Sequence, residues 1–92
     1  ITANNASCVT LASYFSTNGM FKNNSEWENL ATGDVIFFDW ACDGSTDHVG
    51  IVIGHNNNFV YTVEGNSGDV VRIKAYELNS PVIYGYAFIE YQ

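Results

Sequence analysis

The chain has 92 residues, of which 47% are apolar and 15% aromatic. That length allows one small domain with a marginal core, and the aromatic content excludes a disordered chain. Ten acidic residues against three basic ones give a net charge of −7, which disfavours nucleic acid as a partner and favours a neutral or cationic one. No apolar run approaches the roughly 20 residues that cross a bilayer, so we expect no membrane insertion.

The first predicted element is a short amphipathic helix from Cys8 to Phe15. Its apolar residues Cys8, Leu11, Ala12 and Phe15 follow the spacing of one helical face, and Gly19 supplies a stop. Cys8 belongs to this apolar stripe, so packing is its default role.

Five strands are predicted after a polar loop that covers residues 22–32. Each is a run of β-branched and aromatic residues bounded by turn residues: 35–40, 49–53, 59–64, 70–75 and 83–89. Because short turns join consecutive strands, we expect a five-stranded antiparallel sheet in a single α+β domain over residues 1–92.

Two of these strands bring together residues that are able to carry chemistry. If the hairpin loop covers residues 54–58, His48 lies directly opposite Glu64, with Cβ atoms about 5 Å apart. Asn66 shares their face if the strand continues through Gly65. A carboxylate or amide that orients an imidazole is half of a catalytic triad. An ordinary cross-strand ion pair is the alternative, and a one-residue slip would separate the pair.

Three consecutive segments resemble the CHAP domain, a cysteine-dependent amidase and peptidase module of peptidoglycan hydrolases. They are GDVIFFDW at 33–40, DHVGIV at 47–52 and VYTVEGNSGD at 60–69, and the likeness continues to YGY at 84–86. This resemblance implies a papain-like (NlpC/P60) fold without a metal or cofactor. It also implies that His48 is the general base, Glu64 its orienting partner and Asn66 a further polar member of the site.

The nucleophile of CHAP domains lies in a Trp-Cys-Ala-x-Phe-Val-Ser-Trp segment that begins a long helix, and this chain has no such segment. Cys8 departs from that motif and lies 40 residues before His48, closer than the family's cysteine usually does. We therefore expect Cys8 to be structural, although a catalytic role for it stays open. Since the chain begins at Ile1 without Met, we expect the C-terminal part of the domain, inactive alone and completed by an upstream segment or partner chain.

Two weaker signals concern metals and sugars. Asp39, Asp43 and Asp47 follow a calcium-loop pattern in part, but the position for its final carboxylate is Gly50, so we favour a polar turn. Trp40 has the chemistry to stack on a sugar ring, but an aromatic residue beside a strand is more often part of the core.

The resemblance implies a peptidoglycan hydrolase that cuts the N-acetylmuramoyl–L-alanine bond or a peptide bond. It also implies a secreted or wall-associated protein of a Gram-positive bacterium, or a phage lysin. The alternative is a degenerate, non-catalytic module that binds cell wall or protein.

Overall fold

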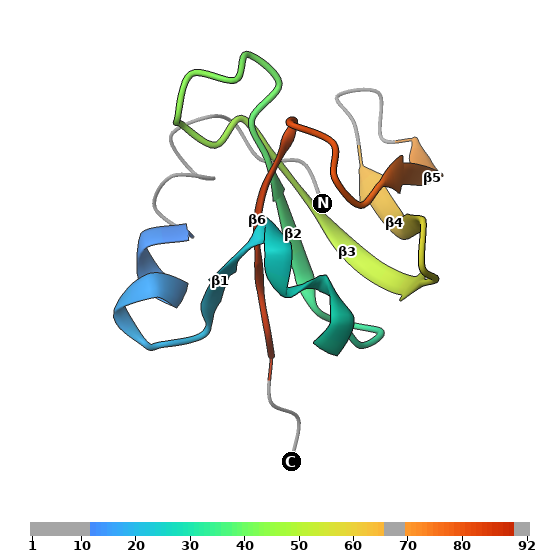
Figure 1. The fold of residues 1–92 in the computed structure, drawn as a ribbon. Coiled ribbons are helices and arrows are strands. Elements are labelled where there is room, and N and C mark those ends of the chain that lie inside the picture. The colour runs from blue at the N-terminus through green and yellow to red at the C-terminus, as the bar shows by residue number, and fades with distance from the viewer. Residues whose placement is uncertain (1–11, 66–69, 90–92) are drawn as a thin grey trace.

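The computed structural model describes residues 12–65 and 70–89. They form a six-stranded antiparallel open sheet in the order β1-β6-β2-β3-β4-β5 (Figure 1). The strands are β1 (Phe21–Asn23), β2 (Val35–Phe38), β3 (His48–His55), β4 (Phe59–Gly65), β5 (Val71–Glu77) and β6 (Ile83–Ala87). None of the described helical segments has the length and hydropathy needed to cross a bilayer.

The central strand β2 is buried on both faces of the sheet, which explains its uninterrupted apolar sequence. Ile36 and Phe38 point into one core cluster, and Val35 and Phe37 point into a second cluster on the opposite face. Full burial of such side chains contributes about 1.5–3 kcal/mol each. β2 therefore contributes side chains to the core on both faces of the sheet.

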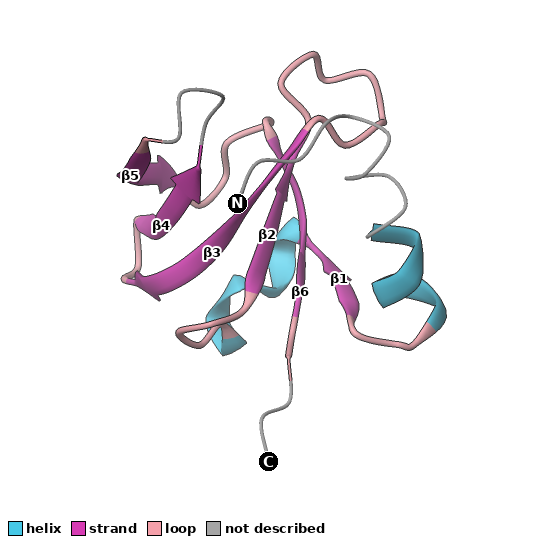
Figure 2. Ribbon diagram, turned by 180° about the vertical axis from the view of Figure 1, so that it is seen from behind, coloured by secondary structure: helices cyan, strands magenta, loops and turns pink. Residues whose placement is uncertain are grey.

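Each face of the sheet is covered by one short helix, and Figure 2 shows both. The α-helix over residues 12–17 places Ala12 and Phe15 in the second cluster. A turn at Gly19, whose φ is +73°, follows the helix. The 3₁₀ helix η1 (Asn24–Asn29) packs Trp27 against the first cluster.

The expected five-stranded α+β fold is corrected to a mostly β fold with six strands. The additional strand β1 falls in the segment predicted as a loop, where η1 also lies. β1 pairs with β6 alone, and its three residues are too few to show an alternating pattern. The predicted helix is found over 12–17, and its first part, including Cys8, lies outside the described residues.

The β3–β4 hairpin contradicts the register assumed from the sequence. Ile51 faces Val63 and Val52 faces Thr62, and an irregularity follows before Gly54 faces Tyr61. The ladder is thus displaced by two residues from the expected one, which places Glu64 beside Gly50 rather than directly across from His48. A displacement of two residues preserves the face to which each side chain points.

Asp34 is buried and holds together two parts of the chain. Its carboxylate accepts hydrogen bonds from the backbone N–H groups of Ala31 (2.8 Å) and Ile89 (2.9 Å). Its own carbonyl oxygen accepts a hydrogen bond from the N–H group of Val52 at 2.7 Å. The Gly-Asp pair in the first resembling segment therefore closes the turn before β2 and fixes the end of β6.

Candidate functional site

His48 and Glu64 form a contact on the face of the sheet that holds the first core cluster. Nε2 of His48 lies 2.8 Å from Oε1 of Glu64, which is hydrogen-bonding distance. The Glu64 side chain is 3% exposed and that of His48 is 19% exposed. The predicted contact is therefore confirmed, although it runs diagonally between the strands and not straight across.

Three hydrogen bonds hold the Glu64 carboxylate. Besides His48, the hydroxyl of Thr62 donates to Oε2 at 2.6 Å and that of Tyr76 donates to Oε2 at 2.7 Å. Burial, together with the hydrogen bond to Glu64 and its negative charge, raises the pKa of the Tyr76 phenol. Tyr76 therefore stays protonated and keeps donating at neutral pH.

This network determines which nitrogen of His48 carries the proton. Where the Glu64 carboxylate accepts this hydrogen bond, Nε2 of His48 is the nitrogen that donates it. In the neutral imidazole the lone pair is then on Nδ1, and no hydrogen bond to Nδ1 is formed within residues 12–65 and 70–89. The imidazole is thus oriented by Glu64 and presents a basic nitrogen.

Thr62 and Tyr76 are members of the network that the sequence analysis did not identify. The signal for Thr62 was available, because a residue two positions before Glu64 on a strand shares its face. Tyr76 lies opposite Val60 on the neighbouring strand, so finding it required the pairing of β4 with β5.

Aromatic rings form one wall of the site. The ring of Trp40 stacks on Phe38 with centroids 4.8 Å apart and an interplanar angle of 7°, and its centroid lies 5.7 Å from that of His48. Trp40 is 44% exposed, so it is not a core residue. The indole limits the space in which the His48 ring can rotate, and it offers a flat apolar surface beside that ring.

The remaining predicted site residues are not brought to His48 by the described structure. Asn66 and Cys8 lie outside the described residues. Cys42 has a free, exposed thiol, and its Sγ contacts the carbonyl oxygen of Pro81 at 3.7 Å. None of the described hydrogen bonds joins a thiol to His48.

A family model described as a putative amidase domain matches residues 6–84, which is most of the chain. The chain belongs to this amidase family. Membership indicates a hydrolase of amide bonds, and His48 and Glu64 both lie inside the matched range. Comparison with curated proteins and with solved structures returns no match.

The loop between β2 and β3 of this amidase domain brings three aspartates together, with carboxylate oxygens within 4.8 Å of one another: Asp39, Asp43 and Asp47. Each carboxylate is used within the loop: Asp39 accepts from the N–H groups of Asp43 and Gly44, Asp43 from Ser45, and Asp47 from Ala41. Burial alone would raise the pKa of Asp39, but these backbone hydrogen bonds lower it below its ordinary value. These hydrogen bonds give the three aspartates a role in forming the turn, whether or not the loop binds a cation.

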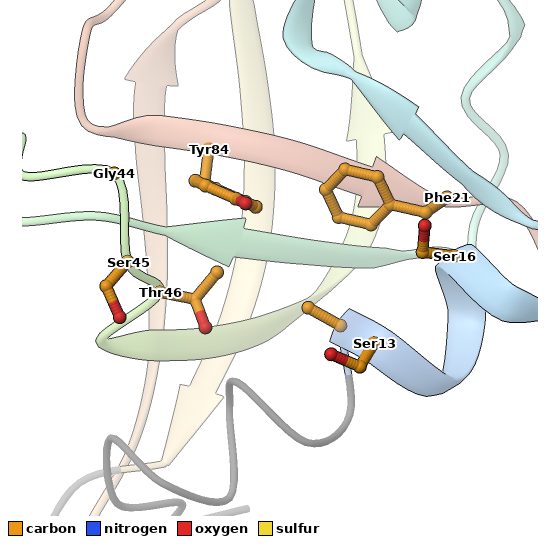
Figure 3. Close-up of a pocket in the computed structure, with 8 residues that line it drawn as sticks. Ser13, Ser16, Phe21, Gly44, Ser45, Thr46 and Tyr84 are labelled. Carbon is orange, nitrogen blue, oxygen red and sulfur yellow. The ribbon is translucent and has the colours of Figure 1, made fainter.

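A cavity of the amidase domain away from His48, about 210 Å³ in volume, lies between the 12–17 helix, β1 and the loop before β3 (Figure 3). Its polar side chains are hydroxyls, from Ser13, Ser16, Ser45, Thr46 and Tyr84. It has no carboxylate, imidazole or amine among its described lining residues, so it offers no general base. The site at His48 is the better candidate for chemistry.

Proposed function

We propose that this amidase domain hydrolyses an amide bond of bacterial peptidoglycan, with a thiol as the nucleophile and His48 as the general base. The observation that carries the proposal is the His48–Glu64 contact at 2.8 Å, which leaves Nδ1 of an oriented imidazole unbonded among the described residues. Family membership supports amide hydrolysis. The resemblance of residues 33–40, 47–52 and 60–69 to CHAP domains supports peptidoglycan as substrate and a papain-like architecture.

In the proposed reaction, Nδ1 of His48 takes the proton of the thiol, and the thiolate attacks the carbonyl carbon of the scissile amide. The tetrahedral intermediate collapses to a thioester when His48 gives its proton to the departing amine. Water, deprotonated by Nδ1, then attacks the thioester, which yields a carboxylic acid and restores the thiol. Glu64 stabilises the imidazolium that forms in both halves of the reaction.

The thiol would come from a cysteine upstream of Ile1, in the same polypeptide or in a partner chain. Support comes from the poor fit of Cys8 to the CHAP motif. Cys8 is the competing source. If Cys8 is the nucleophile, Cys8→Ala should abolish labelling of the 92-residue chain by a slow thiol-reactive electrophile, whereas Cys42→Ala should not.

The substrate determines where the protein would act. Peptidoglycan lies outside the cytoplasmic membrane, so a secreted or wall-associated protein of a Gram-positive bacterium, or a phage lysin, fits the proposal. The bond would be the N-acetylmuramoyl–L-alanine amide or a peptide bond of the stem or cross-bridge.

Loss of turbidity of purified Gram-positive cell walls tests the proposal. The complete encoded protein, extended upstream through the cysteine segment, should clear the walls, and His48→Ala should abolish clearing. His55→Ala is the matched control, because His55 bonds the carbonyl oxygen of Leu30 and lies outside the site. Equal clearing by the His48→Ala variant would refute the proposed role of this residue.

A non-catalytic wall-binding module is the second candidate, since Cys8 does not fit the cysteine motif of CHAP domains. It predicts that the complete protein sediments with cell walls but does not clear them, and that His48→Ala leaves sedimentation unchanged.

A further inference from the structure

The edge strand β5 carries basic side chains to the candidate site. β4 and β5 pair so that Arg72 faces Glu64 and Lys74 faces Thr62. Tyr76, two residues further along, bonds Glu64, which shows that this alternating set points to the face of His48. Arg72 and Lys74 are two of the three basic residues in a chain of net charge −7. Two of the few cations of this acidic chain therefore lie on the face that carries His48.

A cavity of about 270 Å³ lies at this place, lined by Trp40, His48, Glu64, Gly65, Arg72 and Lys74. The general base, the exposed indole and both cations therefore border the same space.

The carboxylate of Glu64 does not pair with Arg72 or Lys74. Although Arg72 faces Glu64 across the ladder, Oε1 of Glu64 is bonded to His48 and Oε2 to two hydroxyls. Within residues 12–65 and 70–89, neither Arg72 nor Lys74 has a carboxylate oxygen within 4.0 Å. Both side chains are exposed and therefore accessible to a ligand.

We propose that Arg72 and Lys74 bind a carboxylate of the substrate, so that the domain prefers an amide with a free carboxylate nearby over a neutral one. This inference rests on the proposed function. A guanidinium pairs with a carboxylate through two parallel hydrogen bonds, and a lysine adds a point charge. β3 and β5 are two strand spacings apart, about 10 Å. The bound carboxylate would thus lie within about three residues of the amide at His48.

Binding of small probes to the 92-residue chain tests this inference without requiring activity. The probes are the four stereoisomers of acetyl-dialanine with a free C-terminal carboxylate, each paired with its neutral carboxamide. Binding is followed by the NMR shift of the Trp40 indole N–H. At least one acid should bind about tenfold more tightly than its carboxamide, and Arg72→Gln combined with Lys74→Gln should remove the difference. Lys22→Gln, on the opposite edge strand β1, is the matched control.

Acids that bind no more tightly than their carboxamides would overturn the inference, and so would selectivity that survives both substitutions. The two proposals fail in different ways. Selective binding by the 92-residue chain, together with a complete protein that never clears cell walls, would retain the carboxylate site and reject the hydrolase. Clearing of cell walls by the complete protein, without tighter binding of the acids by the 92-residue chain, would retain the hydrolase and reject the carboxylate site.

Discussion

Gly50 lies against the side chain of Glu64, where a Cβ atom would be 2.8 Å from Cγ of Glu64 and 3.4 Å from the carbonyl oxygen of Val63. Carbon atoms do not approach so closely without displacement. The absence of a side chain at position 50 therefore makes room for the carboxylate that orients His48.

Gly50→Ala should push Glu64 out of its hydrogen-bonding position. We expect a loss of about 1–3 kcal/mol in the free energy of unfolding, measured by urea denaturation. Gly54→Ala is the control on the same strand, because a Cβ there meets no atom within 4 Å, and it should change stability by less than about 0.5 kcal/mol. Equal effects of the two substitutions would contradict this account of Gly50.

Glu64→Ala should be among the most destabilising changes at the site. It removes the acceptor of His48, Thr62 and Tyr76 together, and breaking such a buried network costs about 3 kcal/mol. Glu77→Ala, an exposed carboxylate at the end of β5, should be nearly neutral in the same denaturation experiment. A small loss from Glu64→Ala would mean that the three donors find other partners.

Two tyrosines should respond to the same substitution with opposite signs. The hydroxyl of Tyr86 is buried and has no hydrogen-bond partner among the described residues, so Tyr86→Phe should raise the free energy of unfolding by about 1 kcal/mol. Tyr76→Phe removes the hydrogen bond to Glu64 and should lower it by about 1–2 kcal/mol. If both substitutions change the free energy of unfolding in the same direction, then either the Tyr86 hydroxyl has a hydrogen-bond partner or the bond from Tyr76 to Glu64 does not stabilise the fold.

Stability should also decline at alkaline pH because of Tyr86. Burial raises the pKa of Tyr86 to about 12, from about 10 in an unfolded chain. The unfolded chain therefore loses this proton first, so stability is intact below about pH 10 and falls as the pH rises toward 12. Tyr86→Phe should make the decline shallower in urea titrations between pH 9 and 12, and superimposable curves would refute this assignment.

The sequence was sufficient to predict the main strands because their apolar runs are dictated by burial. β2 is buried on both faces and reads as one uninterrupted run, and β3 and β4 differ from the prediction by only a few residues at their ends. β1 was missed because a three-residue edge strand is defined by its pairing with β6, which no local pattern records.

The candidate site was predicted in part, because the register of the hairpin was wrong by an even number of residues at the site. The hairpin was placed two residues out of its actual register, yet His48 and Glu64 still share a face because side chains repeat every two residues. Tyr76, Arg72 and Lys74 reach the site only through the pairing of β4 with β5. The predicted strand over residues 70–75 contains both basic residues, but the sequence did not locate the face that they share with Glu64.

The central claim is that Glu64 holds the proton of His48 on Nε2 and leaves Nδ1 as the base. Long-range ¹H–¹⁵N NMR correlations of the 92-residue chain, recorded at alkaline pH where an imidazole is neutral, measure this directly. The account predicts that Nε2 of His48 is protonated and Nδ1 is not, and that Glu64→Ala produces a mixture of both tautomers. A proton on Nδ1 in the unmodified chain would contradict it.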